Sequence, residues 1–144
     1  MKDILCFHAF ENCYGIPLNM LQETFDEQKV TPVPFLNPLF TGLCNHNGII
    51  YPVLSFSRLC QKDIPDKRCC MLLLHVGDYQ LILRMNDIPI IIHERDITNE
   101  TAYEGGVDNL KIYRICQKRD QLIYILDMKQ IIEDLSEHML YLNE

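Results

Sequence analysis

Residues 42–53 constrain the fold of this chain more than any other segment. Two apolar runs in it flank the polar pair Asn47-Gly48, and the whole segment reads Gly-Leu-Cys-Asn-His-Asn-Gly-Ile-Ile-Tyr-Pro-Val. Asn-Gly is the strongest short-range signal for a two-residue hairpin, because both central positions of a type I′ turn need a positive φ. The segment therefore predicts two antiparallel strands joined at Asn47-Gly48.

Many other short strands are predicted, with turn residues between them. The apolar runs that indicate them lie at residues 5–10, 13–17, 69–76, 79–85, 88–92, 110–116 and 122–126. Residues 69–76 are almost continuously apolar, which is typical of a strand buried on both faces. Pro89 favours an edge position for 88–92. Residues 110–116 do not alternate regularly, which indicates a bulge or burial on both faces.

Helix is predicted in three places. Residues 19–25 have Asn19 as a plausible N-cap with Gln22 three residues later, and a short helical turn is expected at 55–60. In the first of these, Leu18, Leu21 and Phe25 would share one face. Asp127 is expected to cap a C-terminal helix whose apolar residues fall at helical spacing, namely Met128, Ile131, Ile132, Leu135, Met139 and Leu142. We expect that helix to pack on the sheets, with binding of a partner as the alternative.

Three segments are expected to connect these elements. Residues 29–38 hold three prolines, so we expect an extended connection anchored to the core by Val33 and Phe35. Residues 61–67 are expected to form a loop between two halves, and residues 93–109 a polar, mobile loop. The whole pattern predicts a mostly β chain of small barrels or sandwiches, closed to hide strand edges.

Composition and charge exclude several classes of function. The chain has 144 residues, 48% of them hydrophobic, which is enough for a core in one domain. Its formal net charge of −7 makes nucleic acid and anionic lipid poor partners. No secretion signal and no apolar run of about 18–20 residues is visible. We therefore expect a soluble, cytoplasmic protein without membrane insertion.

Catalytic, cofactor and metal motifs are missing from the sequence. The seven cysteines include no pair with the two-residue gap of a zinc or redox site, so reduced thiols acting as small hydrophobes are expected, with a metal or redox role as the alternative. His8 and His75 lie in predicted strands and are expected to be hydrogen-bonded structural residues, whereas His46 is expected in solvent at a turn. We predict no enzyme and no cofactor, although a carboxylate pair assembled in space stays open.

The order of several segments matches the pattern of a known family. The matching pieces are a strand at 7–10 with an acidic turn at 11–12, Tyr-Gly-Ile-Pro-Leu at 14–18, Leu21 followed two positions later by Glu23, Val-Thr-Pro-Val-Pro at 30–34, the hairpin at 42–53 and Leu-Asp-Met at 126–128. In this order they resemble the CheW-like coupling proteins of bacterial chemotaxis. The resemblance covers nearly the whole chain, is strong through residue 53 and at the end, and is weak at 88–109.

Three polar positions depart from the family pattern. Asn47 stands where the family has its signature Arg, and Ser55 where it usually has Asp. Arg84 stands where an Asp is common in the second-half strand. The apolar framework is kept, so the departures concern partner contacts more than the fold. They suggest a divergent coupler with altered receptor choice or weaker coupling.

The resemblance implies one CheW-like domain over residues 1–144. Two intertwined, five-stranded, SH3-like β-barrels are expected, the first at about 12–66 and the second at about 67–126, packed with the N-terminal strand and the C-terminal helix. It further implies a non-catalytic adaptor that joins methyl-accepting chemoreceptors to a CheA-type histidine kinase. The first-half barrel would dock on the kinase's regulatory domain, and a groove between the halves would take the receptor's helical hairpin tip.

Five residues carry over as candidate partner contacts: Leu21, Glu23, Gly42, Asn47 and Gly48. The alternative to a partner contact is turn geometry for Gly42 and Gly48, and packing in the core for Leu21. Glu23 is the strongest candidate, because an isolated acid on a short helix has little packing to do. Two other functions stay open: a CheW-like module in a non-chemotactic kinase pathway, and a β-barrel that senses a small ligand or metal.

Overall fold

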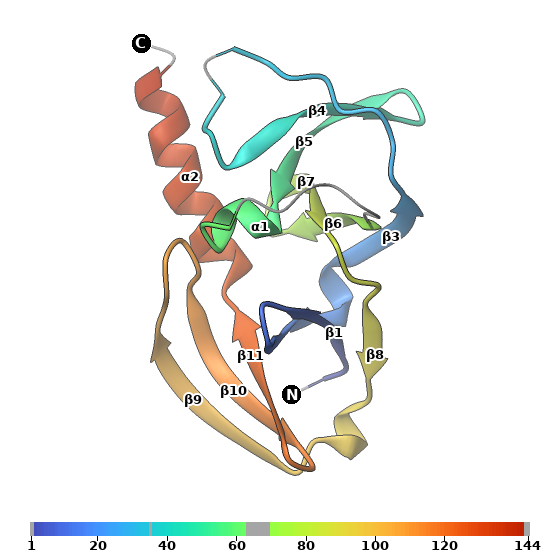
Figure 1. Ribbon diagram of the computed structural model, residues 1–144, viewed down its shortest axis with the longest axis vertical. Helices are drawn as coiled ribbons and strands as arrows, with labels where there is room; N and C mark the ends of the chain where they lie inside the picture. The colour runs from blue at the N-terminus through green and yellow to red at the C-terminus, as the bar shows by residue number, and fades with distance from the viewer. Residues whose placement is uncertain (1, 35, 63–69, 143–144) are drawn as a thin grey trace.

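The computed structural model describes residues 2–34, 36–62 and 70–142, with side chains up to residue 135. Two β-sheets and a C-terminal helix make up these residues, so the predicted mostly β fold is confirmed (Figure 1). The six-stranded sheet has the order β8 (Ile90–Ile92), β1 (Ile4–Ala9), β2 (Asn12–Pro17), β11 (Gln121–Leu126), β10 (Ile112–Lys118), β9 (Asn99–Gly105). The five-stranded sheet has the order β3 (Leu21–Asp26), β6 (Cys70–Val76), β7 (Tyr79–Met85), β5 (Ile49–Ser55), β4 (Phe40–His46).

The two sheets are intertwined along the chain. The chain begins in the six-stranded sheet with β1 and β2, builds the whole five-stranded sheet, and returns at β8. Parallel pairing of β2 with β11 brings an early and a late segment of the chain side by side, with Tyr14 opposite Tyr124. The strands β6 and β7 follow the division expected near residue 66, and they pair with β3 and β5. The barrel boundaries given above stay a prediction.

Alternating residues of the strands fill three separate apolar clusters. On β1, Leu5 and Phe7 face a central core to which both sheets and the helices contribute. Ile4 and Cys6 on the same strand face a second cluster, made by the six-stranded sheet alone. A third cluster lies inside the five-stranded sheet, where Met71 and Leu73 of β6 are buried. Strand β6 is thus buried on both faces, which explains the continuous apolar run predicted at 69–76.

A short helix, α1 (Phe56–Leu59), places an aromatic ring at the centre of the central core. The Ser55 hydroxyl caps this helix and accepts a hydrogen bond from the backbone N–H of Arg58 at 3.2 Å. The Phe56 ring then packs edge-on against Phe7 and Tyr14, with ring centroids 4.9 and 5.2 Å away. The helical turn predicted at 55–60 is confirmed.

The C-terminal helix, α2 (Met128–Leu142), packs against the central core as predicted. Asp127 accepts a hydrogen bond from the backbone N–H of Gln130 at 3.1 Å, which is the expected cap. The apolar stripe of the helix is buried in the core at Met128, Ile131, Ile132 and Leu135. Figure 1 shows the helix rising along the side of the five-stranded sheet.

Turn and edge predictions agree with the structure. Asn47 and Gly48 join β4 to β5 with φ values of 53° and 86°, as a type I′ turn requires. A register shift between Ile112 and Arg114 is the predicted bulge in β10. The short strand β8, which follows Pro89, lies at one edge of the six-stranded sheet.

The helix predicted over residues 19–25 is wrong. A single 3₁₀ turn, η1 (Leu18–Met20), leads directly into β3, where Leu21 pairs with Leu74 and Phe25 with Met71 of β6. Pairing with a neighbouring strand supplies hydrogen bonds and burial that outweigh the weak local preference for helix. Leu21 and Glu23 therefore lie on an edge strand.

The segment 93–109 is not one irregular loop. It contains the 3₁₀ turn η2 (Glu94–Asp96) and the strand β9, which pairs with β10 across the bulge. The sequence signal was lost because β9 is exposed along most of its length and so lacks apolar alternation.

The anchor expected at Val33 is also wrong, because this side chain is 37% exposed. Thr31 holds the proline-rich connection instead, through two backbone hydrogen bonds with Leu43 of β4 at 2.8 and 2.9 Å. Expectations for Phe35, for most of the 61–67 loop, for Cys69 and for the side chains of Met139 and Leu142 fall outside the described residues.

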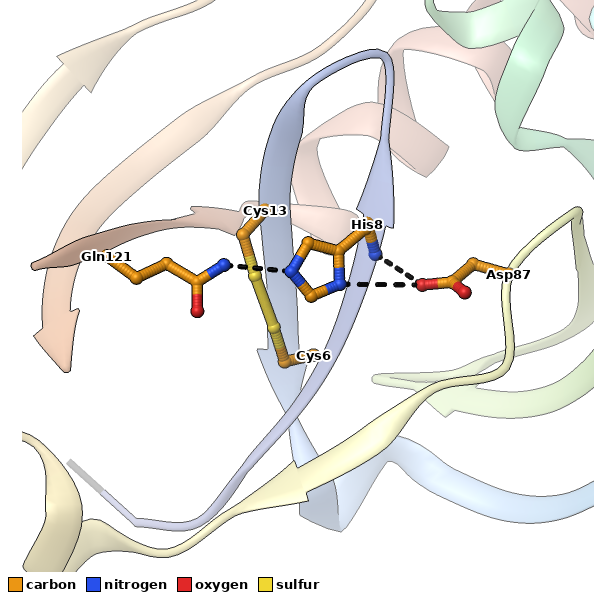
Figure 2. The surroundings of a disulfide bond; sticks show 5 residues. All are labelled: Cys6, His8, Cys13, Asp87 and Gln121. Atoms are coloured by element: carbon orange, nitrogen blue, oxygen red, sulfur yellow. Dashed lines mark hydrogen bonds and ion pairs between the residues drawn. A yellow bond between two sulfur atoms is a disulfide. The ribbon is translucent and has the colours of Figure 1, made fainter. Parts of the chain in front are cut away.

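Two of the cysteines form a disulfide across β1 and β2. Cys6 lies opposite Gly15 and Cys13 opposite His8, so the bridge runs diagonally between neighbouring strands, with Cα atoms 6.8 Å apart (Figure 2). Both residues are buried in the cluster of the six-stranded sheet. The expectation of reduced thiols is wrong for this pair, because antiparallel pairing brings together cysteines seven positions apart in the sequence.

Candidate interaction surface

The five candidate contact residues lie at the two edges of the five-stranded sheet. Leu21 and Glu23 are on β3, Gly42 is on β4, and Asn47 and Gly48 form the turn that follows β4. The strands β3 and β4 stand at opposite ends of the strand order, yet their side chains meet. The sheet therefore curls round on itself, and its two edges come together at the β4–β5 turn.

His46 fills the junction between these two edges. It is the last residue of β4 and only 6% exposed. Its ring stacks on Phe25 of β3, with centroids 4.1 Å apart and planes 9° apart. Its Nε2 atom lies 2.7 Å from Oε2 of Glu23, and its Nδ1 atom 3.0 Å from Oε1 of Gln28. The expectation of a solvated turn histidine is wrong.

The alternation along β4 carried the signal that would have found this residue. Phe40, Gly42, Cys44 and His46 are buried, whereas the residues between them are more exposed. A period of two therefore places His46 on the inner face of the sheet. The position of His46 directly before the Asn47-Gly48 turn favoured exposure to solvent and masked this signal.

Glu23 bridges the buried junction and the surface. Its side chain is 45% exposed, while its carboxylate pairs with the His46 ring beneath it. The expectation of an isolated acid on a short helix is therefore wrong. Glu23 lies on the edge strand β3, and its carboxylate contacts the His46 ring. Leu21 packs partly buried against the central core, in agreement with the packing alternative.

Gly42 is required by the close approach of the chain that crosses it. Its φ is +148°, and a Cβ atom there would collide with the backbone carbonyl of Thr31. Gly48, with φ +86°, faces open space, so only its turn conformation demands glycine. Asn47 adopts a positive φ of 53° and lies 3.4 Å from the His46 ring through its side-chain nitrogen. The structure thus brings Glu23, His46 and Asn47 together, while both glycines shape the backbone.

A cavity lies where the chain passes from one sheet to the other. Its volume is about 530 Å³, and its walls include Phe25 and Asp26 of β3, Cys70 of β6 and Ile88. Ile88 is 70% exposed. The next residues, Ile90 and Ile91 on the edge strand β8, are 53% and 51% exposed. Ile88 lines the cavity, and Ile90 and Ile91 point to opposite sides of this edge strand. We name these three exposed isoleucines at the edge of the six-stranded sheet the β8 surface.

Three exposed apolar side chains lie at one end of the five-stranded sheet. Ile49 and Ile50 begin β5 and are 56% and 63% exposed, and Tyr79 begins the adjacent parallel strand β7. Because β5 and β7 run side by side in the same direction, their first residues lie at the same end of the sheet. We name these three residues the β5–β7 surface.

The other polar departures from the family pattern have structural roles. Arg84, on β7, forms an ion pair with Glu27, and Ser55 is the cap of α1. His8 is hydrogen-bonded as expected: its Nε2 atom lies 2.8 Å from Nε2 of Gln121, and its backbone N–H donates to Asp87 at 2.6 Å (Figure 2). His75, on β6, is exposed.

Burial raises the pKa of several thiols. The pKa of Cys60 rises to about 12, mainly because its sulfur is removed from water and secondarily because Asp108 is near. The pKa values of Cys44, Cys70 and Cys116 rise for the same main reason. A neutral thiol is a poor metal ligand and nucleophile, so these cysteines act as small apolar residues.

Within residues 2–34, 36–62 and 70–142, no cluster of three or more histidine, cysteine or acidic side chains is placed to hold a metal ion. The helices in the same residues are all too short or too polar to cross a membrane. The described surface instead has two groups of exposed apolar side chains and the Glu23 carboxylate, which is hydrogen-bonded to His46. Such features suit the binding of other proteins.

Comparisons with known proteins agree with this arrangement. The family model described as "CheW-like domain" matches residues 3–136. The chemotaxis protein CheW of Bacillus subtilis (strain 168) is 26% identical over 129 residues, which is 83% of this chain and 80% of that protein. The crystal structure of the scaffolding protein TtCheW from Thermoanaerobacter tengcongensis superposes with a TM-score of 0.68 at 21% identity, covering 88% of each chain. With a family model matched over almost its whole length and the fold in agreement, this chain belongs to the CheW-like family.

Proposed function

We propose that this protein is a non-catalytic adaptor that couples methyl-accepting chemoreceptors to a CheA-type histidine kinase in the cytoplasm. Membership of the CheW-like family supports an adaptor role in general. An adaptor of this kind must hold two partners at once, so it needs two separate binding surfaces. The observation that carries the proposal is the presence of two exposed apolar surfaces on different sheets.

The β8 surface suits the helical tip of a receptor. A helix binds in a groove through apolar side chains on one face, while polar residues at the rim orient it. The cavity beside β8 offers apolar walls at Phe25 and Ile88 and an acidic rim at Asp26 and Asp87.

The β5–β7 surface suits the regulatory domain of the kinase. It lies at the start of β5 and β7 in the five-stranded sheet, whereas β8 belongs to the six-stranded sheet. The proposal requires that a protein on one surface leaves the other open. Ile49, Ile50 and Tyr79 provide an aromatic and two branched apolar side chains, the kind that anchor protein interfaces. The β4–β5 turn with Asn47 and Gly48 borders this surface.

The proposal is tested by titrating the purified protein, in a calorimeter, with each partner from the same organism. One partner is the regulatory domain of the CheA-type kinase, and the other is the cytoplasmic hairpin tip of a receptor. We expect saturable binding to both. A charge placed in an apolar contact should lower the affinity about tenfold or more. Ile50→Glu should therefore weaken binding of the kinase domain alone, and Ile90→Glu should weaken binding of the receptor tip alone.

Leu122→Glu is the matched control, because Leu122 is 46% exposed on β11 and belongs to neither surface. It should leave both affinities unchanged. If the protein binds neither the kinase domain nor the receptor tip, the adaptor proposal is refuted and a ligand-sensing role is favoured. Binding only to a kinase from a non-chemotactic pathway would instead assign the module to that pathway.

A further inference from the structure

The Cys6–Cys13 bridge lies in the middle of the six-stranded sheet. Cys6 on β1 and Cys13 on β2 are both buried, with 0% and 4% of their surface exposed. Cys6 also lies opposite Ile90, the first residue of β8. Cys13 also lies opposite Ile123 of β11. One covalent link therefore joins the two central strands of the run β8-β1-β2-β11.

The segment that carries the β8 surface is attached to β1 and to the residue before it. The backbone N–H of His8 donates a hydrogen bond to the Asp87 carboxylate at 2.6 Å (Figure 2). The three residues of β8 pair with the first three residues of β1. The Asp3 carboxylate accepts a hydrogen bond from the backbone N–H of Glu94 at 2.9 Å. Because all three attachments lead to β1 or its start, the position of the β8 surface follows that of β1.

A disulfide has a particular meaning in the compartment that the proposed function gives this protein. Thiols of cytoplasmic proteins are kept reduced by glutathione and thioredoxin, and a disulfide formed there is ordinarily transient, catalytic or redox-sensing. The strand pairing nonetheless places Cys6 and Cys13 where they bond. A pair that can bond, in a compartment that favours thiols, is suited to pass between the two states.

We propose that Cys6 and Cys13 are a reversible thiol–disulfide site that controls the β8 surface. In the disulfide form, β1 is covalently held to β2, and the attached segment presents its isoleucines in one arrangement. In the dithiol form, strand pairing alone holds β1 to β2, so the hairpin opens more often and β8 follows it. The inference rests on the proposed function and deepens it, since it adds a regulation of receptor binding.

The site takes a small disulfide for oxidation and a dithiol for reduction. On oxidation, the Cys13 thiolate attacks one sulfur of oxidised glutathione, forms a mixed disulfide and releases one glutathione thiolate. The Cys6 thiolate then attacks the Cys13 sulfur and releases the second glutathione. The two protein thiols thus lose two electrons and two protons, which appear in two molecules of reduced glutathione. A dithiol such as dithiothreitol reverses the exchange and is itself oxidised to a disulfide.

Cys13 is the sulfur that an exchange partner reaches first. It is the second residue of β2 after a tight turn, in which Phe10 and Glu11 have φ values of 51° and 71°. Glu11 and Asn12, next to it, are exposed, and such segments open locally at low free-energy cost. Cys6 lies two residue pairs further from the turn.

Redox equilibration of the folded protein tests the site itself. The protein is held in mixtures of reduced and oxidised glutathione that bracket the cytoplasmic ratio, and its thiols are then blocked with a maleimide. Peptide mass mapping gives the fraction that carries the Cys6–Cys13 bridge. We expect the pair to pass from thiols to disulfide within this series. A pair that stays fully bonded or fully reduced throughout would overturn the inference.

Hydrogen exchange followed by mass spectrometry tests the control of β8 without any partner. Amides of residues 87–92 should exchange about three- to tenfold faster in the reduced protein than in the oxidised protein. Cys13→Ala, which cannot form the bridge, should exchange at the fast rate under both conditions. Equal rates in the two forms of the wild-type protein would overturn the inference.

Calorimetry with the receptor hairpin tip tests the consequence for binding. The oxidised form should bind about three- to tenfold more tightly, because an ordered β8 segment loses less entropy on binding. The kinase regulatory domain should bind both forms equally, since its proposed surface lies on the five-stranded sheet. Equal affinity of the tip for both forms would overturn the inference and leave the proposed function in place. Absence of tip binding in both forms, with exchange rates that still differ, would refute the proposed function and leave the redox site in place.

Cys116→Ala is the matched control, because Cys116 is buried in the same apolar cluster and lies outside the bridge. This variant should keep the full redox response in all three measurements. Loss of the response in Cys116→Ala would assign the responding thiol to a different pair and overturn the inference.

Discussion

The imidazole Nε2 atom of His46 lies 2.7 Å from the carboxylate of Glu23, and this contact joins the two edge strands of the five-stranded sheet. Unpaired strand edges are sites of unwanted association, which natural proteins cover or close. Here β3 and β4 are linked by side chains, and a backbone bridge joins Thr31, in the connection after β3, to Leu43 of β4. The closure brings a buried histidine beneath a residue that the family resemblance marks as a partner contact.

Replacing Gly42 by alanine should destabilise the fold by about 2–3 kcal/mol. The new Cβ would strike the Thr31 carbonyl, in a backbone conformation that alanine rarely adopts. Gly48→Ala is the control: it has a positive φ but open space around it, so we expect a loss of about 1 kcal/mol. Urea unfolding of both variants measures the difference. Equal losses would show that the crossing of Thr31 over Gly42 does not determine the need for glycine.

Asn47→Arg restores the side chain found at this position in the family pattern. Arginine lacks the ease with which asparagine adopts a positive φ, so we expect a small loss of stability, about 0.5–1 kcal/mol. It also places a permanent charge beside His46 and close to Glu23. Because this turn borders the β5–β7 surface, we expect tighter binding of the kinase regulatory domain, measured by calorimetry. Unchanged affinity would mean that the missing arginine does not explain divergence, and Asn47→Gln controls for side-chain length.

The Cys6–Cys13 bridge predicts a mass about 2 Da below that of the fully reduced chain, and a peptide map that links these two cysteines. Breaking a small disulfide loop should lower the free energy of unfolding by about 2–3 kcal/mol. A thiol reductant should therefore lower the melting temperature of the wild-type protein and leave that of Cys13→Ala unchanged. Equal responses of the two proteins would contradict the bridge.

Stability should fall as the pH rises above about 9, in part through Cys60. The pKa of its thiol is about 12 in the folded protein and close to 9.0 in the unfolded chain. Between these values the unfolded state has lost this proton while the folded state keeps it, so raising the pH favours unfolding. Below pH 9 the contribution is fully present.

Cys60→Ala isolates this contribution, because alanine keeps the site apolar and removes the titrating group. Unfolding free energies at pH 8, 9, 10 and 11 should decline less steeply in Cys60→Ala than in the wild-type protein. The raised pKa values of Cys70 and Tyr113 act in the same direction in both proteins and cancel in the comparison. Parallel declines would contradict the assignment to Cys60.

Local patterns predicted most strands and turns because those signals are short-range. Asn47-Gly48 needs only its own backbone to form a turn, and Ser55 and Asp127 cap the helices that directly follow them. The order of the two sheets was not contained in such signals. It depends on pairing between distant segments, such as β2 with β11, and it was inferred from the family resemblance instead.

The candidate site was predicted in part for the same reason. Leu21, Glu23, Gly42, Asn47 and Gly48 were named from the motif, but their environment came from packing between distant strands. Residues 19–25 carry helix-compatible capping signals, and pairing with β6 overrides them. His46 was missed because burial beside a turn depends on β3, which lies more than 20 positions away in the sequence.

An adaptor of this kind holds a receptor and a kinase on one molecule at the same time. Sedimentation velocity on an equimolar mixture of this protein, the receptor hairpin tip and the kinase regulatory domain tests it most directly. We predict one faster-sedimenting species that contains all three, which Ile50→Glu reduces to a complex with the tip and Ile90→Glu to a complex with the kinase domain. Mutual displacement, in which each partner expels the other, would refute the adaptor role.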